Sequence, residues 1–530
     1  MTQQPESASG RALAITFGWS AFALAASAPA EIAAQDHSRH EDHGTPAPAP
    51  TEQADHAAMD HSAANESGDG LTLRRVPEDC KAGESEHYTE DDGRFVVWRC
   101  AGTSQPEMGH GSTDYGEHRP ALVAPLPTQF SGCRSLGALL DDGSVVQGTI
   151  CRPAEGSGTA RLPAKDGGHQ GVHFDLGGDW NGMAHGFAWG LYTEQTGPRG
   201  DAGAYVLSMA MLSAEKRFGW GRLQLRSMIS ADPLMGQRGY AVLFAAGETA
   251  GGQPLVDRQH PHDLFMELAA RVDVNLSPGT TAFLYGGPVG EPAIGPAAFM
   301  HRASARLNPE PPITHHWFDS THITYGVVTA GVASRLWQLE ASAFRGEEPD
   351  EERWDIDAPR LDSWSVRATL NPSPNWQMQV SHARLEEPET LHPGEDEART
   401  TASVAYTSGT GFAATAAFAA KNRMPGETLT AWLAEASWDV TERHTLFGRF
   451  ENVANDELFP DHDDPLHDRT FRVSKLIAGY AYTLPLGPFG LSLGGTAARF
   501  FKPSALDAAY GADPMGYTLF AKLTLGQHLR

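Results

Sequence analysis

From about residue 172 onward the chain is a succession of strand-length segments joined by connections of alternating length. Most segments are about ten residues long, the length that a tilted strand needs to cross a bilayer. Connections after even-numbered segments are tight, and most of those after odd-numbered segments are long. Short turns on one rim and long loops on the other are typical of outer-membrane β-barrels. We predict sixteen strands, at about 185–195, 204–215, 219–230, 263–275, 279–287, 320–332, 335–345, 361–371, 375–385, 399–408, 411–420, 428–439, 443–453, 471–484, 488–501 and 515–525.

Alternation of side chains within the predicted strands favours the same fold. In 361–371, Arg367 shares one face with small hydroxyl residues, whereas Trp364 and Val366 share the other. In 263–275, one face has Glu267, Arg271, Asp273 and Asn275, and the other has Met266, Leu268, Ala270, Val272 and Val274. Charged side chains cannot face lipid cheaply, so they face the lumen. The predicted fold class is all-β, a transmembrane antiparallel β-barrel of about 16 strands at 172–530.

The overall composition does not oppose a membrane barrel. Mean hydropathy is −0.36, but strands that alternate apolar and polar residues never build a long apolar run. The formal net charge of −26 excludes the basic footprint of a nucleic-acid-binding protein. It suits cations, or solubility in a crowded envelope. The expected partners are therefore outer-membrane lipid, metal ions and periplasmic metal-handling proteins, with no nucleic acid.

The first segment, 1–34, is predicted to be a signal peptide. Arg11 precedes an apolar run, and Ala28-Pro29-Ala30 forms a small-x-small cleavage site. The run is too short, and too rich in Ala, Gly and Ser, for a convincing membrane helix. The alternative is a disordered Ala-rich leader. A signal peptide predicts export, and with the barrel it predicts a cell outer-membrane location.

The next segment, 35–70, is predicted to be a disordered tail rich in His and Asp, because nothing in it can bury a core. Imidazole and thioether together favour copper, whereas imidazole alone also serves zinc and nickel. The alternative is a polar spacer that contains His by chance. The candidate ligands in this tail are His37, His40, His43, His56, Met59 and His61.

Residues 71–165 hold all four cysteines of the chain and are predicted to form a small disulfide-bonded, β-rich periplasmic region. An even cysteine number in an exported chain suggests disulfides. The simplest pairing joins sequence neighbours, Cys80–Cys100 and Cys133–Cys151. Each closes a loop of roughly 20 residues, which contributes on the order of 3 kcal/mol in the chain-entropy model.

The central third of the chain concentrates imidazoles and carboxylates on loops that the topology places at one rim. These ligand types suit a transition metal. The competing interpretation is a hydrogen-bonded network that holds the long loops inside the lumen, because buried polar groups must be paired whatever the function. The candidate metal ligands are His260, His262, Asp263, Glu267, His301, His315, His316, Asp319 and His322.

Two further patterns are weighed against simpler explanations. The acidic segment 346–357 could bind Ca²⁺ through carboxylate oxygens, or be a solvated loop. Ser320 and His322, with Asp319, invite a hydrolase interpretation, since a nucleophile needs its base within hydrogen-bond reach. Both side chains are expected to point into the lumen, away from lipid. We therefore assign no catalytic residue, expect no enzyme, and expect no cofactor beyond copper or zinc ions.

Several strings at these motifs resemble an uncharacterised family of bacterial outer-membrane β-barrel proteins, for which the resemblance implies no established activity. The tail around 55–62 resembles the Met/His-rich leaders of copper-resistance protein B. Together these features predict an outer-membrane barrel that takes part in copper or zinc binding, transport or resistance. The alternatives are a general porin or structural envelope protein and, behind them, an outer-membrane lipid hydrolase. The strings of the first resemblance are 257–268, 286–292, 299–302 and 315–322.

Overall fold

The structure is a computed structural model of the chain. The predicted signal peptide, the His-rich tail with its six candidate ligands, Cys80 and Cys100 lie outside the described residues. Side chains are described from residue 153 onward. The described ranges are 85–89, 95–99, 132–139, 145–166, 171–277, 279–467 and 469–526.

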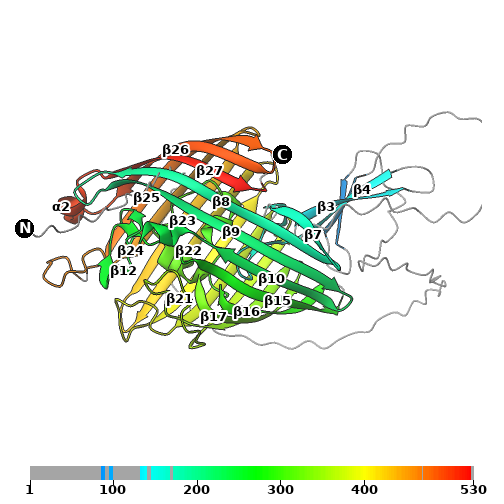
Figure 1. Ribbon diagram of the computed structural model, residues 1–530, viewed down its shortest axis with the longest axis horizontal. Helices are drawn as coiled ribbons and strands as arrows, with labels where there is room; N and C mark the ends of the chain where they lie inside the picture. Colours follow the sequence, from blue (N-terminus) through cyan, green and yellow to red (C-terminus); the bar gives the residue numbers. More distant parts are fainter. Residues whose placement is uncertain are drawn as a thin grey trace, which may run out of the picture.

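Sixteen antiparallel strands close a barrel, which confirms the predicted fold class (Figure 1). The last strand pairs with the first, β27 with β8, and a short strand β7 (Val172–Gly177) pairs with the opening residues of β8. The strands are β8 (Trp180–Gln195), β9 (Ala202–Phe218), β10 (Gly221–Ile229), β15 (Phe265–Ser277), β16 (Thr280–Gly290), β17 (Thr324–Ser334), β18 (Trp337–Phe344), β19 (Ser363–Ser373), β20 (Trp376–Leu385), β21 (Asp396–Thr407), β22 (Phe412–Met424), β23 (Thr428–Asp439), β24 (His444–Asn455), β25 (Phe471–Leu486), β26 (Phe489–Phe501) and β27 (Met515–Leu525).

The connections sort by length onto two rims, as the sequence predicts. Turns such as 219–220 and 335–336 make a short-turn rim. Connections such as 230–264 and 291–323 make a long-loop rim, where 425–427 is a short exception. In Figure 1 the long-loop rim, with helix α2 (Asp507–Tyr510), lies on the left and the C-terminus on the right.

The outer surface of the barrel is apolar. Along β20 every second residue is exposed, including Val380, which is 56% exposed at the middle of the strand. A continuous apolar surface around a whole barrel is far larger than soluble proteins expose, and hydrocarbon suits it. Among the described residues, no helix is long and apolar enough to cross a membrane. Exposed aromatic side chains ring the short-turn rim, as at a membrane interface: Trp220, Trp337, Trp376, Phe412 and Trp438.

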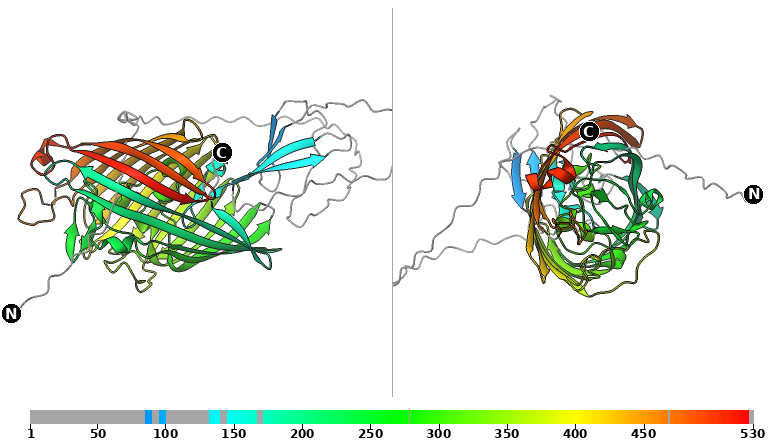
Figure 2. Two further views of the ribbon diagram at one scale, coloured as in Figure 1. Left: turned by 45° about the horizontal axis from the view of Figure 1, so that its top comes forward. Right: turned by 90° about the vertical axis from the view of Figure 1, so that its left-hand side faces the viewer.

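Two segments of the chain fill the lumen. The lumen hairpin consists of β5 (Ala154–Glu155) and β6 (Arg161–Leu162), and the lumen loop is residues 291–323. The right-hand view of Figure 2 looks into the barrel from the long-loop rim and shows ribbon segments inside the ring of strands. The two segments meet where the Ala298 amide donates to the Ser157 hydroxyl at 2.8 Å.

Side chains of the barrel wall hold the lumen hairpin. Gln338 donates to the Thr159 carbonyl at 2.8 Å, Thr159 donates to Glu340 at 2.5 Å, and Arg226 donates to the Gly158 carbonyl. We expected 71–165 to be a region in front of the barrel. Its last residues instead lie inside the barrel, because their polar groups find partners there.

Four short strands precede the hairpin and form one antiparallel sheet in the order β1-β2-β4-β3. The backbone register places Cys133 directly opposite Cys151. The pairing is compatible with the predicted Cys133–Cys151 disulfide, which stays a prediction. The strands are β1 (Ser85–Thr89), β2 (Phe95–Arg99), β3 (Gly132–Leu139) and β4 (Val145–Arg152).

Two local expectations were wrong. The predicted strand 320–332 begins only at Thr324, because a 3₁₀ turn occupies Ser320–His322. Met266 is almost fully buried instead of facing outward. The partner of β15 shifts between Met228 and Ile229, which marks a β-bulge. A bulge adds one residue and re-aims its side chain, so Met266 and Glu267 are both buried.

The apolar exterior predicts a depth-dependent cost for charge. We expect Val380→Arg to lower the free energy of unfolding in lipid vesicles by about 2–4 kcal/mol, the cost of arginine near the bilayer midplane. Leu361→Arg, on an exposed loop, is the control and should cost much less. Urea titration in vesicles measures both. Equal stability of the two variants would contradict a lipid-facing position for Val380.

The cysteine pairing is tested by non-reducing peptide mapping. We expect the peptides that contain Cys133 and Cys151 to be linked, because the register holds their backbones opposite one another. We expect Cys80 to be linked to Cys100 by exclusion. Free thiols or crossed linkage would contradict the prediction.

Candidate metal centre at the long-loop rim

Five of the six imidazoles that were predicted for the rim pack against one another inside the long-loop rim. The His315 ring lies 5.3 Å from that of His322 and 5.5 Å from that of His316, measured between ring centroids. His262 packs on His322 at 5.5 Å, and His260 on His315 at 6.2 Å. Two loops, 230–264 and 291–323, supply these rings. The expectation that the topology brings them together is met.

The sixth imidazole and three of the predicted carboxylates have other surroundings. His301 is buried on the turn Phe299–His301 of the lumen loop. Asp263 pairs with Arg353 at 3.3 Å, and Glu267 accepts hydrogen bonds from Arg226 and Tyr285, each at 2.7 Å. Asp319 accepts from His315 at 2.9 Å and pairs with Arg302 at 3.5 Å. Metal ligation by these residues stays a prediction.

The Nδ1 atoms of several clustered imidazoles lie against oxygen atoms. His260 lies 2.9 Å from Glu248, and His262 lies 2.9 Å from Asp232. His322 Nδ1 lies 2.6 Å from the Asp319 carbonyl, whereas its buried Nε2 makes no hydrogen bond among the described residues. A second ring atom fixed by an oxygen is the usual arrangement of metal-ligating histidines.

Burial keeps two of these rings neutral. It lowers the pKa of His260 to about 4, although the Glu248 carboxylate acts in the opposite direction. It also holds the pKa of His322 well below its ordinary value, with His315 and His262 acting in the same sense. Neutral imidazole is the form that binds metals.

The tightest candidate ligand set combines one imidazole of the cluster with two carboxylates. Glu248, His316 and Glu348 each offer a ligand atom, and these atoms lie within 4.8 Å of one another. His316 Nδ1 and Glu348 Oε1 pair with each other at 3.2 Å, without the alignment of a regular hydrogen bond. A dication that displaces the shared proton could contact both atoms.

An acidic cavity of about 260 Å³ lies beside this set, lined in part by Glu248 and Glu348. Gly247 also lines it, with φ of +110°, and a Cβ at that position would lie 2.9 Å from the His316 ring. Only glycine lets the backbone approach the imidazole so closely. The cavity gives the ligand set room on one side, as an exchangeable ion requires.

The electrostatics of the set favour a positive charge at its centre. Burial opposes protonation of His316, but the carboxylates of Glu348 and Glu248 outweigh burial and raise the pKa of His316 to about 9. Without a metal, protonated His316 balances the two carboxylates. A dication at the same place can supply that balance after it displaces the proton.

Two other acidic groups are weaker candidates. In the group Glu389, His392 and Glu457, Glu389 is already neutralised by Lys421 and by Arg423, the latter at 3.1 Å. The group Asp350, Asp355 and Asp357 comes from the acidic segment 346–357 and is largely exposed. We assign neither group as a metal site.

The hydrolase interpretation finds no support in the contacts of Ser320 and His322. The Ser320 hydroxyl accepts a hydrogen bond from Arg399 at 2.9 Å. His322 Nδ1 is engaged by the Asp319 carbonyl at 2.6 Å. The serine is thus paired with a guanidinium, whereas an activated nucleophile needs a base beside it.

Sequence reasoning placed His316 in the site but missed both of its carboxylate neighbours. Glu248 lies on the short strand β12 (Glu248–Ala250), in the same loop as His260 and His262 but apart from them in the sequence. Glu348 belongs to the acidic segment, which the sequence suggested only for calcium. Neither glutamate stands at a short, fixed spacing from a histidine in the sequence, so no local pattern marks it as a ligand.

Buried ion pairs hold the lumen loop in place, which is the alternative that the sequence suggested for this region. Arg302 pairs with Glu435 at 2.6 Å, and Glu310 pairs with Lys475 at 2.5 Å. Thr314 donates to Glu451 at 3.1 Å. These contacts fix the backbone that carries His315 and His316, so a locked loop is compatible with a ligand site at these residues.

No family model and no curated protein sequence matches the chain. Among solved structures, it is similar to Salmonella typhi OmpF in complex with daunomycin, with a TM-score of 0.45, 9% identity, and 67% of this chain and 100% of that chain covered. For the anion-selective porin from Comamonas acidovorans, the TM-score is 0.40 and the identity is 10%, with 65% of this chain and 100% of that chain covered. For the outer-membrane channel DcaP of Acinetobacter baumannii, the TM-score is 0.39 and the identity is 9%, with 67% of this chain and 100% of that chain covered.

The buried pairs predict that Lys475→Met destabilises the barrel. The substitution leaves the Glu310 carboxylate buried without its cation, which typically costs about 3–5 kcal/mol. The double variant Lys475→Met/Glu310→Gln should recover most of that loss. Equilibrium unfolding in detergent measures all three proteins. If the single variant is as stable as the parent, the pair does not hold the loop.

Proposed function

We propose that the protein is an outer-membrane β-barrel that binds a divalent transition metal, copper or zinc, at its long-loop rim. In this proposal it acts in the binding, transport or resistance of that metal. Three features support the membrane location: the apolar exterior, the aromatic side chains at the short-turn rim, and the sorting of loops by length. Its partners are outer-membrane lipid, metal ions and periplasmic metal-handling proteins.

The observation that carries the metal proposal is the set Glu248, His316 and Glu348. Two of its buried ligand atoms, His316 Nδ1 and Glu348 Oε1, lie 3.2 Å apart as an ion pair without the alignment of a regular hydrogen bond. One imidazole nitrogen and two carboxylate oxygens suit Cu²⁺ and Zn²⁺. The adjacent acidic cavity leaves a coordination position open to solvent or to an arriving ion.

A general open porin fits the described lumen poorly. The lumen hairpin and the lumen loop occupy it from opposite rims and meet at Ser157 and Ala298. The wall side chains that would line a pore are engaged with these two segments, as Arg367 is with the Gly295 carbonyl at 3.1 Å. A filled lumen supports selective handling of a small ion over free diffusion of solutes.

The tail at 35–70 has a separate part in the proposal. Its candidate ligands, which lie outside the described residues, would bind several ions loosely, because each contact must also offset the cost of ordering the chain. The rim set lies on loops anchored by rigid strands, so it should bind one ion more tightly.

The test is a titration of Cu²⁺ and Zn²⁺ into the full chain and two variants, His316→Ala and Glu348→Gln. Loss of a ligand should weaken the tight site by at least about tenfold, the lower end of what even outer-shell changes cost. The control is His444→Ala, an exposed histidine at the short-turn rim. Loose binding by the tail should be unchanged in all proteins.

Glu348→Gln keeps the shape of the side chain, so it separates ligation from folding. If both variants retain tight binding, the rim set is part of the network that holds the loops, and the proposed function fails. If the parent itself binds metal only loosely, the proposal fails in the same way.

A further inference from the structure

One of the apolar clusters inside the barrel, the methionine face, consists mainly of methionine. The chain has 13 methionines. Five of them are buried in a single cluster, and a sixth, Met300, packs against it. The five are Met183, Met209, Met211, Met228 and Met266. The larger apolar cluster of the lumen, which includes Leu433, Phe447 and Phe520, has no methionine among its described buried residues, so the buried thioethers are concentrated at one place.

Strand register places thioethers and an imidazole at one level of the barrel. His185 on β8 is directly opposite Met211 on β9, and Met211 is directly opposite Met228 on β10. Directly opposed residues have Cβ atoms about 4.5–5.5 Å apart. The next strand, β15, has the bulge that buries Met266 beside Glu267. The row of His185, Met211 and Met228 therefore spans three strands. On β15 the residue directly opposite Met228 is Glu267, with Met266 beside it.

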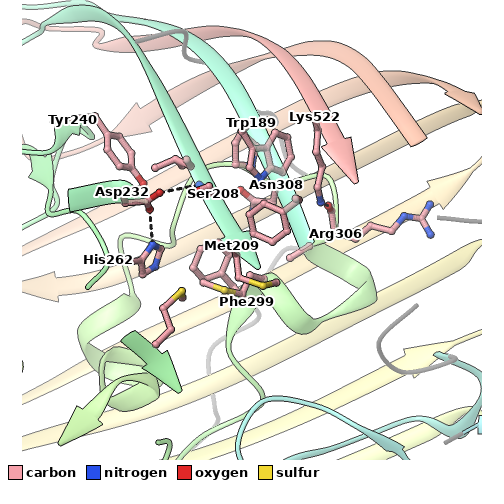
Figure 3. Close-up of a pocket in the computed structure, with 16 residues that line it drawn as sticks. Trp189, Ser208, Met209, Asp232, Tyr240, His262, Phe299, Arg306, Asn308 and Lys522 are labelled. Carbon is pink, nitrogen blue, oxygen red and sulfur yellow. Dashed lines mark hydrogen bonds and ion pairs between the residues drawn. The ribbon is translucent and has the colours of Figure 1, made fainter. Parts of the chain in front are cut away.

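A small cavity lies at the edge of this methionine face. Met209, Met266, Met300 and His262 line it together with Arg306, which pairs with Asp439, and Lys522, which donates to the Arg306 carbonyl. Its volume is about 20 Å³, enough for one water-sized occupant. Figure 3 shows Met209 and Phe299 at the cavity, with His262 joined to Asp232. Asp232 also accepts from the Ser208 amide at 2.8 Å, so the imidazole is held from behind.

We propose that the methionine face and its cavity form a binding site for a soft monovalent cation, Cu(I) or Ag(I). Thioether sulfur selects such ions, whereas carboxylate and water oxygens select hard ones. Asp232 and Glu267, the nearby carboxylates named above, are engaged with His262 and Arg226, so the donors that remain are sulfur and imidazole. The site shares no residue with the rim set and does not depend on the proposed function there.

Ordinary core packing is the competing explanation, because methionine fills irregular gaps well. Leucine has nearly the same volume, and such exchanges usually cost less than about 1.5 kcal/mol. Substitution by leucine therefore keeps the packing and removes only the sulfur. A packing role predicts no change in cation affinity, and a ligand role predicts a large one.

The experiment titrates Ag⁺ into the full chain and into Met209→Leu/Met266→Leu/Met300→Leu. A second variant, Met211→Leu/Met228→Leu, tests the row across the strands. Met378→Leu is the matched control, because Met378 lies on β20 and is exposed on the barrel exterior. We expect both multiple variants to lose at least about tenfold in Ag⁺ affinity. Zn²⁺ binding should be unchanged. The difference in mobility between the unheated and the boiled protein on a denaturing gel, which reports a folded barrel, should also be unchanged.

Unchanged Ag⁺ affinity in both multiple variants would overturn the proposal. A 36–62 deletion that binds no Ag⁺ would also overturn it, because the tail would then account for all the Ag⁺ that the parent binds. Silver-edge X-ray absorption of the loaded parent gives a second readout that does not depend on variant folding. It should show sulfur neighbours, and a shell of nitrogen and oxygen alone would also overturn the proposal. Loss of Zn²⁺ binding with Ag⁺ retained would instead bear only on the rim set.

Discussion

Every backbone amide and carbonyl in a hydrocarbon layer must find a partner inside the protein, and a closed barrel is the way a sheet meets that demand. The pairing of β27 with β8 removes the last free edge. Closure then fixes the rest of the architecture. Because the strands must alternate between lipid and lumen, half of their side chains turn toward an enclosed space. That space must be filled with water, with protein, or with both.

In this chain protein fills it, and both ion pairs and apolar contacts hold the filling in place. Arg302, Glu310 and Thr314 of the lumen loop each find a charged partner on the wall. The loop is therefore held by pairs whose separation would leave buried charges behind. The same rigidity gives the imidazole cluster its fixed geometry. The methionine face differs from the larger apolar cluster of the lumen in its concentration of thioethers.

Much of the barrel could be predicted from the sequence, because alternation and loop length are local properties. Arg367 and Val366 face opposite sides as their neighbours suggest, and the strand number is right. The bulge at Met266 could not be predicted, since it depends on the register between two strands. The site was half predictable. His260, His262 and His316 lie near other histidines in the sequence, whereas Glu248 and Glu348 reach His316 only through the fold of two long loops.

The lumen hairpin has a consequence for how the barrel can assemble. Its partners Arg226, Gln338 and Arg367 lie on β10 and on the adjacent strands β18 and β19, which β15, β16 and β17 separate from β10 around the wall. The hairpin precedes the first strand of the barrel in the chain, so its attachment joins the segment before the barrel to distant parts of the sheet. Enclosure of the hairpin and closure of the sheet are then steps of one cooperative event. A chain that lacked the hairpin would have to close its barrel without these contacts, although Arg226 and Arg367 would keep their ion pairs with Glu267 and Glu340.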